Sequence, residues 1–353
     1  MFIKKNLLIV FILAFIINCT DNTNELSIDY EKYTLDNGLK VILHKDSSDP
    51  LVAISTIVHV GSNREKPGKT GFAHFFEHMA FTASENTPRG ANRLLIPTWG
   101  GSRNGGTSFD YTIYYEIVPK DALEKLMWID SDRLGFMINT VDAETLEGEI
   151  QVVKNEKRQR VDNQPYGHSS GIIQKALYPQ GHPYSWSVIG ELEDLQAATI
   201  EDVKEFYNEF YGPSNATVVI AGDIDFDETK QLVERWFGEI KPNENIIEKP
   251  EVRLVTLSET KKLYHLDKYA QLPQLSLTFP SVEQFSKDSY ALNTLGELLS
   301  NGRNSVFYKE IIEKQQLAPS ASAYNYSSEI AGQFSMSVRA NANTSLNDIY
   351  DAI

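Results

Sequence analysis

The chain contains a single cysteine, Cys19, among its 353 residues. One cysteine cannot form a disulfide within the chain, so we expect neither the fold nor a metal site to depend on sulfur. Basic residues are scarce relative to acidic ones, with 33 Lys and Arg against 48 Asp and Glu, which gives a net charge of −15. Because general nucleic-acid binding requires a basic surface, this balance argues against a nucleic-acid partner.

Long apolar runs are also missing, because the longest one, residues 7–17, is too short to span a membrane. It follows two lysines and ends just before Cys19, which is typical of a signal peptide over residues 1–19. The end of this segment resembles a bacterial lipoprotein signal, from which Asn18 departs because a small residue is usual there. We expect a lipidated Cys19 to anchor the chain to a membrane of the bacterial cell envelope, in the periplasm or at the outer membrane. The alternative is an ordinary secretory signal with an incidental cysteine.

A candidate metal motif occurs in the order His-x-x-Glu-His, formed by His74, Glu77 and His78. Two histidines four residues apart lie on one face of a helix, so both rings can reach one ion, and neutral imidazole is a good zinc ligand. Glu77 is close enough to take a proton from a metal-bound water without being a ligand itself. The alternative is an amphipathic core helix, since apolar residues surround the three: Phe72, Phe75, Phe76, Met79 and Phe81.

The order of these three residues is the inverse of the usual zinc-protease order. Here the chain resembles the pitrilysin, or insulinase, family of zinc peptidases (M16), in particular the N-terminal half of a bacterial member, over nearly all residues after position 28. The resemblance implies an α+β fold of tandem domains, each a mainly antiparallel sheet with helices packed on one side. Two short strands joined by Asn37-Gly38, a strong hairpin signal, agree with such a sheet.

A second set of acids lies on the expected helix over residues 143–160, where Glu149 and Glu156 are seven apart and share one face. Spacing alone favours a solvated face for such a pair. The family carries a third zinc ligand, a glutamate, about as far beyond the motif as Glu156 is here. The resemblance therefore implies that Glu156 is the ligand and Glu149 a supporting acid, with Glu147 as a weaker competitor.

The segment from Trp99 to Asp110 is rich in glycine and precedes an expected strand over residues 111–118. Glycine at this density lets another backbone come close. In the family, the equivalent segment is an edge strand to which the substrate peptide adds as a further strand. The resemblance implies that Asn104 lies next to the scissile bond and that Gly105 also contacts the substrate; a plain flexible loop is the alternative.

We expect a zinc peptidase domain over residues 27–251, closed by an acidic, proline-containing linker that starts near position 241. A second, homologous domain is expected over residues 262–353. Its strand and helix repeat the arrangement that carries the metal motif, but they lack the ligands, so this copy is expected to be inactive.

A non-zinc domain of the family supplies an arginine and a tyrosine that face the substrate. The matching positions here are Ile312 and Pro319, which can do neither job. The second domain is also short, and the chain stops within an expected helix over residues 346–353. We therefore expect the second domain to be truncated, and the pair to come from a missing C-terminal half or a partner subunit.

Together these features predict a zinc-dependent endopeptidase that hydrolyses peptides or unfolded polypeptides. His74, His78 and Glu156 would hold Zn2+, and Glu77 would act as the general base. Two alternatives remain open: a non-catalytic assembly or binding subunit of the same fold, and a metal-dependent hydrolase that acts on something other than peptides.

Overall fold

The computed structural model describes residues 27–243 and 248–353. The expected signal peptide, Cys19 and part of the expected linker lie outside these ranges, so lipidation and membrane anchoring stay predictions. By its internal contacts the chain divides into residues 1–30 and one compact unit over residues 31–353. No helix in the described ranges has the length and apolar character of a membrane-spanning segment.

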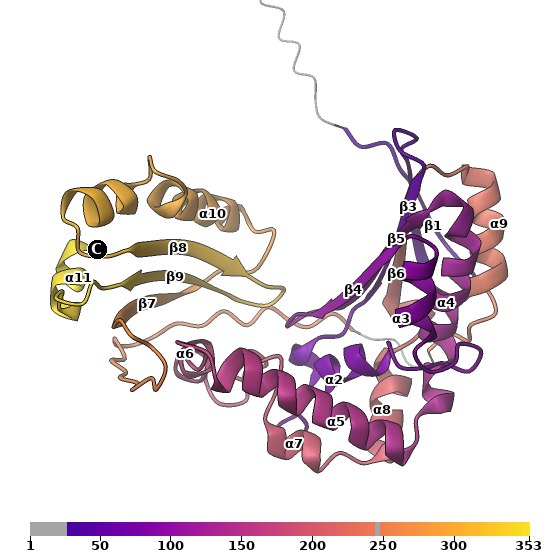
Figure 1. Cartoon of the computed structure of the whole chain (residues 1–353), viewed down its shortest axis with the longest axis horizontal. Coiled ribbons are helices and arrows are strands. Elements are labelled where there is room, and N and C mark those ends of the chain that lie inside the picture. Colours follow the sequence, from indigo (N-terminus) through magenta and orange to yellow (C-terminus); the bar gives the residue numbers. More distant parts are fainter. Residues whose placement is uncertain (1–26, 244–247) are drawn as a thin grey trace, which may run out of the picture. The chain divides into compact units, whose positions relative to one another are not determined.

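The first half of the compact unit is built on a six-stranded sheet in the order β1-β2-β6-β3-β5-β4 (Figure 1). Its strands are β1 Glu31–Thr34, β2 Lys40–Lys45, β3 Leu51–Val58, β4 Ser102–Thr107, β5 Thr112–Pro119 and β6 Ala216–Gly222. All neighbouring strands are antiparallel except β2 and β6, which run parallel. The predicted mainly antiparallel sheet is therefore confirmed, and β4 forms one end of it.

The expected hairpin joins β1 to β2, and it is tied to a distant helix. Gly38 adopts a φ of 91°, a conformation that favours glycine. The side chain of Asn37 accepts from the N–H of Leu39 and donates to the carbonyls of Phe237 and Ile240. The turn is thus held by both local and long-range hydrogen bonds.

Helices cover one face of this sheet, as expected. Every second residue of β3, from Val52 to Val58, is buried, because successive side chains on a strand point to opposite faces. Helix α4 (Leu123–Phe136) contacts β3, β5 and helix α9 (Phe226–Phe237), while α3 (Ala91–Thr98) contacts β4 (Figure 1). The other helices here are α2 Phe72–Met79, α5 Ala143–Lys157, α6 Ser169–Leu177, α7 Leu192–Gln196 and α8 Ile200–Phe210. The first half also contains short helical turns: η1 Ser62–Arg64, η2 Lys120–Ala122, η3 Met137–Thr140, η4 Arg158–Asp162 and η5 Pro213–Asn215.

Helix α2, which carries the His-x-x-Glu-His motif, is anchored in the core by its apolar side. Its Phe72, Phe75, Phe76 and Met79 side chains are at most 2% exposed. The ring of Phe76 stacks on that of Phe206 from α8, with 4.9 Å between the centroids. The helix is therefore an amphipathic core helix, and its polar side chains project from a rigid base.

The second half contains a three-stranded antiparallel sheet in the order β7-β9-β8. Its elements are β7 Gln274–Ser281, α10 Lys287–Ser300, η6 Tyr308–Lys314, β8 Ser320–Ser327, β9 Gly332–Arg339 and α11 Leu346–Ala352. A small core of its own includes Phe307, Ile311 and Phe334. The expected strand-then-helix opening is present as β7 and α10, while the exact domain limits stay predictions.

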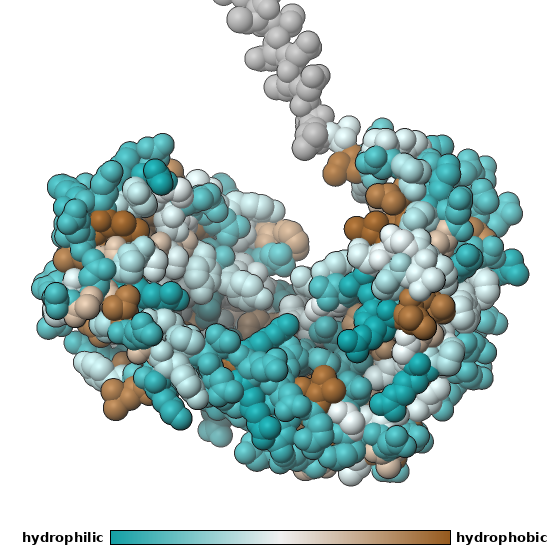
Figure 2. Space-filling view, in the orientation of Figure 1, coloured by the Kyte–Doolittle hydropathy of each residue, from teal (hydrophilic) through white to brown (hydrophobic). Residues whose placement is uncertain are grey.

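Hydrophilic residues predominate on the face of the molecule drawn in Figure 2, and hydrophobic ones occur there in small separate groups. This distribution agrees with the large apolar side chains lying mostly in the cores under the two sheets.

Candidate metal centre

The start of helix α2 is fixed by its surroundings before any metal is considered. Gly71 caps the helix with a φ of 87°, and a Cβ there would lie 2.7 Å from the carbonyl oxygen of Ile189. The buried carboxylate of Glu65 accepts from the N–H groups of Gly71 and Ala73, each at 2.9 Å, and from the indole N–H of Trp186 at 3.1 Å. Burial raises the pKa of Glu65 to about 8, and these donors act in the opposite direction. The first N–H groups of a helix have no partner within it, so Glu65 completes α2.

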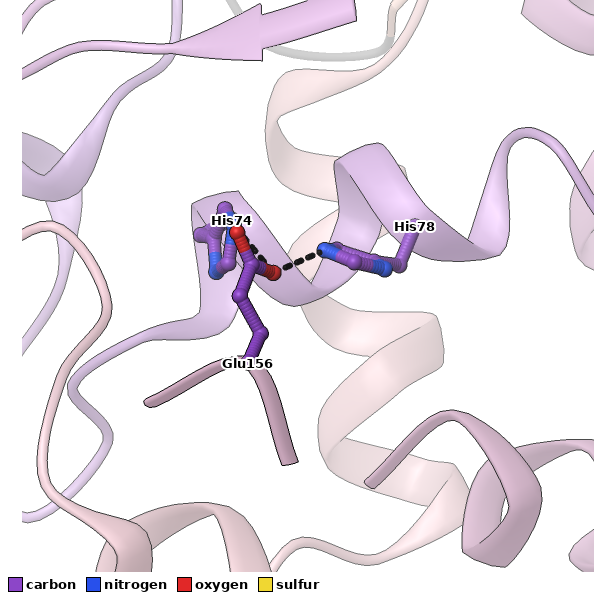
Figure 3. A group of neighbouring side chains, drawn as sticks. All are labelled: His74, His78 and Glu156. Atoms are coloured by element: carbon purple, nitrogen blue, oxygen red, sulfur yellow. Dashed lines mark hydrogen bonds and ion pairs between the residues drawn. The ribbon is translucent and has the colours of Figure 1, made fainter. Parts of the chain in front are cut away.

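The structure brings His74, His78 and Glu156 together, with one ligand atom from each lying within 4.8 Å of the others (Figure 3). The Nε2 atom of His78 is 2.9 Å from Oε2 of Glu156, and Nε2 of His74 is 3.5 Å from the same oxygen. The two histidines come from α2 and the glutamate from α5, and these helices contact each other. Three potential ligands are thus held by two packed helices.

Of the two histidines, His74 is already in the neutral form that can bind a metal, whereas the proton on His78 is favoured by Glu156. Burial lowers the pKa of His74 to about 4, so its ring is neutral at physiological pH and keeps a lone pair for a metal. Burial also acts to lower the pKa of His78, but the hydrogen bond and the negative charge of Glu156 outweigh it and raise this pKa. The hydrogen bond from His78 in turn lowers the pKa of Glu156.

The donor set fits zinc. Two imidazoles and one carboxylate, with a fourth position left for water or substrate, are typical of catalytic zinc sites. Nδ1 of His74 is buried and has no hydrogen-bond partner among the described residues, whereas its Nε2 faces Glu156. Each ligand-bearing helix is itself packed, so little conformational freedom remains to be lost when a metal binds.

Glu77 lies beside the three residues but is not one of them. Its Oε2 accepts a hydrogen bond from the hydroxyl of Thr107 at 2.7 Å. Burial raises the pKa of Glu77, while the Thr107 hydrogen bond and the nearby His78 act in the opposite direction. A half-buried carboxylate next to a potential metal site is suited to accept a proton.

The other two acids on α5 differ in position. Oε2 of Glu149 lies 4.0 Å from Nδ1 of His78, so this carboxylate faces the ring nitrogen that points away from Glu156. Glu147 is exposed, and its Oε1 accepts a hydrogen bond from Gln151. Of the two, only Glu149 is near the group.

Asn104 and Gly105 lie on β4, so the glycine-rich segment is itself a strand rather than only the approach to one. Among the described strands, β4 pairs with β5 alone and is therefore an edge strand. Asn104 is exposed, and its Oδ1 accepts from the N–H of Gly105. Gly105 faces α2, because a Cβ there would lie 3.2 Å from Oε1 of Glu77. The structure thus brings Gly105, but not the Asn104 side chain, against the carboxylate of Glu77.

Three residues near the site were not anticipated: Glu65, Thr107 and Arg160. Nη1 of Arg160 lies 2.8 Å from Oε1 of Glu156, one helical turn along the chain. That four-residue spacing of opposite charges was readable in the sequence. The contacts of Glu65 and Thr107 depend on how distant segments dock, and no local pattern signals them.

Two family models match consecutive parts of the chain. The model described as insulinase (peptidase family M16) matches residues 40–182, and the one described as the peptidase M16 inactive domain matches residues 197–353. The zinc protease PqqE of Helicobacter pylori is 31% identical over 84% of this chain. The aligned region spans 66% of that protein's length.

Solved structures show the same fold. A protease from Helicobacter pylori superposes with a TM-score of 0.83 at 27% identity, covering 92% of this chain and 78% of that one. The periplasmic protease PqqL from Escherichia coli gives a TM-score of 0.68 at 22% identity, covering 90% of this chain but only 36% of that one. The chain belongs to the insulinase family of peptidases, peptidase family M16.

Proposed function

We propose that this chain carries the zinc site of an endopeptidase that hydrolyses peptides or unfolded polypeptides. The observation that carries the proposal is the convergence of His74, His78 and Glu156 beside the carboxylate of Glu77. The family, and relatives named as zinc proteases such as PqqE, support the choice of metal and of reaction class.

In this proposal His74 and His78 would hold the zinc ion through their ring nitrogens, and Glu156 through its carboxylate. A bound zinc ion would lower the pKa of a coordinated water towards neutrality and polarise the scissile carbonyl. Glu77 takes the water's proton at Oε1, because its Oε2 already accepts the Thr107 hydroxyl. Glu77 then returns that proton to the leaving amine. Glu149, at Nδ1 of His78, favours the ring orientation that directs Nε2 towards the site.

The edge strand β4 is the proposed binding place for the substrate backbone. It pairs with β5 on one side, so its other side can receive an extended peptide by main-chain hydrogen bonds. Recognition of this kind requires an extended backbone and few particular side chains, which suits an unfolded polypeptide. Asn104 and Gly105 would contact that peptide.

Full activity is proposed to need groups that the described residues do not supply. Ile312 is half-buried on η6 and Pro319 is exposed just before β8, at the positions where the resemblance implies an arginine and a tyrosine. These two groups would come from a further part of the protein or from a partner subunit. The larger size of relatives such as PqqL, of which this chain covers 36%, supports this part of the proposal.

The experiment is to measure the zinc content of the purified protein and its hydrolysis of a quenched fluorescent peptide, before and after chelation. We expect about one zinc per chain and hydrolysis that chelation removes and zinc restores. Protein that binds no zinc under these conditions would support the non-catalytic subunit instead. Zinc binding without any peptide cleavage, even when further subunits are supplied, would favour a hydrolase of another bond.

A further inference from the structure

The hydroxyl of Thr107 is the only group from outside α2 for which the described residues give a direct hydrogen bond to Glu77. Thr107 lies on β4, thirty residues beyond Glu77, and donates to Oε2 at 2.7 Å. Strand β4 and helix α2 are in contact, so this bond joins two packed elements. A hydrogen bond from a neutral hydroxyl to a carboxylate is stronger than one between two neutral groups.

The same face of β4 also lies against the other carboxylate oxygen of Glu77, Oε1. Gly105 and Thr107 are two residues apart and therefore lie on one face of the strand. A Cβ at Gly105 would lie 3.2 Å from Oε1 of Glu77 and 2.9 Å from the ring of Phe81. Oε2 of the carboxylate thus accepts a hydrogen bond from a hydroxyl, while Oε1 lies against the backbone of a residue that has no side chain.

The Thr107 hydroxyl has two possible acceptors among the described residues, Glu77 and Thr112. Thr112 is paired with Thr107 across β4 and β5, with 3.5 Å between the two hydroxyl oxygens. The hydroxyl of Thr112 donates to the carbonyl of Val60 at 2.9 Å. Thr112 therefore offers Thr107 only an acceptor, but Glu77 lies closer, at 2.7 Å, and carries a charge, so the Thr107 hydrogen is donated to Glu77.

We infer that Thr107 is a positioning residue that holds the carboxylate of Glu77 in one orientation beside the metal site. This inference rests on the proposed function, in which Oε1 of Glu77 receives a proton from water. A glutamate side chain has several rotamers, and a general base must lie within hydrogen-bond distance of the proton that it takes. The substrate-facing edge strand therefore also aligns the base.

The test replaces Thr107 by valine, which keeps the branched shape but removes the hydroxyl, and by serine, which keeps the hydroxyl. We expect Thr107→Val to lower kcat by about tenfold to a hundredfold, with KM and zinc content near the parent values. Thr107→Ser should recover most of kcat. Thr98→Val makes the same chemical change at an exposed hydroxyl of α3 and should leave all three quantities unchanged.

A readout that does not depend on activity is the crystal structure of the zinc-loaded parent and both variants. We expect Glu77 in one orientation in the parent and in Thr107→Ser, and in more than one in Thr107→Val. A single, unchanged Glu77 orientation in Thr107→Val, or an unchanged kcat, would overturn the inference. A parent protein that binds zinc and holds Glu77 in place but cleaves no peptide, even when further subunits are supplied, would instead count against the proposed function. If Thr107→Val does not fold, a disordered Glu77 in the parent or in Thr107→Ser would still overturn the inference.

Discussion

The carboxylate of Glu65 accepts a hydrogen bond from the backbone N–H of Ala73 at 2.9 Å, directly before the first histidine of the metal group. Its second oxygen accepts the N–H of Gly71 at the same distance. A loop residue thus supplies what the first turn of α2 lacks, and it sets where that helix begins.

Replacing Glu65 by alanine should therefore destabilise the protein and weaken its metal site together. Buried N–H groups that lose their acceptor cost about 1–3 kcal/mol, so we expect the free energy of unfolding to fall by roughly 2–4 kcal/mol. Denaturant unfolding of the metal-free protein and a zinc competition titration measure the two effects. Glu144→Ala, at an exposed acid in the first turn of α5, should change the unfolding free energy by about 0.5 kcal/mol at most. Equal effects from both substitutions would contradict the role of Glu65.

The two acids Glu147 and Glu149 should affect zinc binding differently. Glu149 lies 4.0 Å from Nδ1 of His78, whereas Glu147 is exposed and bonded to Gln151. Groups that orient a metal ligand commonly contribute about tenfold to a hundredfold in affinity, so Glu149→Gln should weaken zinc binding by about tenfold. Glu147→Gln, the same change two residues away, should leave the affinity at the parent value. Equal zinc affinities of the two variants in a competition titration would contradict the different roles of Glu147 and Glu149.

The stability of the α8 cap should depend on pH through Asp202. The side chain of Lys69 donates to Asp202 at 2.6 Å, the N–H of Thr199 does so at 3.0 Å, and together they lower its pKa below the ordinary 3.8. A carboxylate with a lowered folded pKa stabilises the fold above the unfolded pKa and loses that contribution as the pH falls through the folded pKa.

We therefore expect Asp202→Asn to cost about 1 kcal/mol or less at neutral pH, because the pair is partly exposed. The difference from the parent should shrink as the pH falls below 3.8. Urea unfolding of both proteins at several pH values measures it. If the difference in unfolding free energy between the two proteins grows as the pH falls, the predicted pH dependence is wrong.

The parts of the fold that could be predicted are those with local signals. The residues Asn37 and Gly38 predicted the hairpin turn between β1 and β2. Strand β4 carries little intrinsic strand preference, since it holds two adjacent glycines, and its pairing with β5 makes it a strand. The helix expected over residues 143–160 gives way after Lys157 to the π-helical turn η4, for which the sequence offers no signal.

The site residues also fall into those that the sequence indicated and those that only the packing of distant segments reveals. His74, Glu77 and His78 share one short helix, so their spacing alone indicated a common site. Spacing could not choose between Glu149 and Glu156, because both lie on one face of α5. The docking of α5 against α2 separates them, with 2.9 Å from Glu156 to His78 and 4.0 Å from Glu149. Glu65 acts through backbone N–H groups, which no side-chain pattern reveals.

The central claim is that Glu77 acts as the base of a zinc peptidase without binding the metal. It is tested by measuring zinc content and peptide hydrolysis side by side in the parent, in Glu77→Gln and in His74→Ala. We expect Glu77→Gln to keep about one zinc per chain and to lose hydrolysis by about a hundredfold to ten-thousandfold. His74→Ala should lose the zinc and the hydrolysis together. A zinc-loaded Glu77→Gln protein that cleaves the peptide at the parent rate would contradict the account.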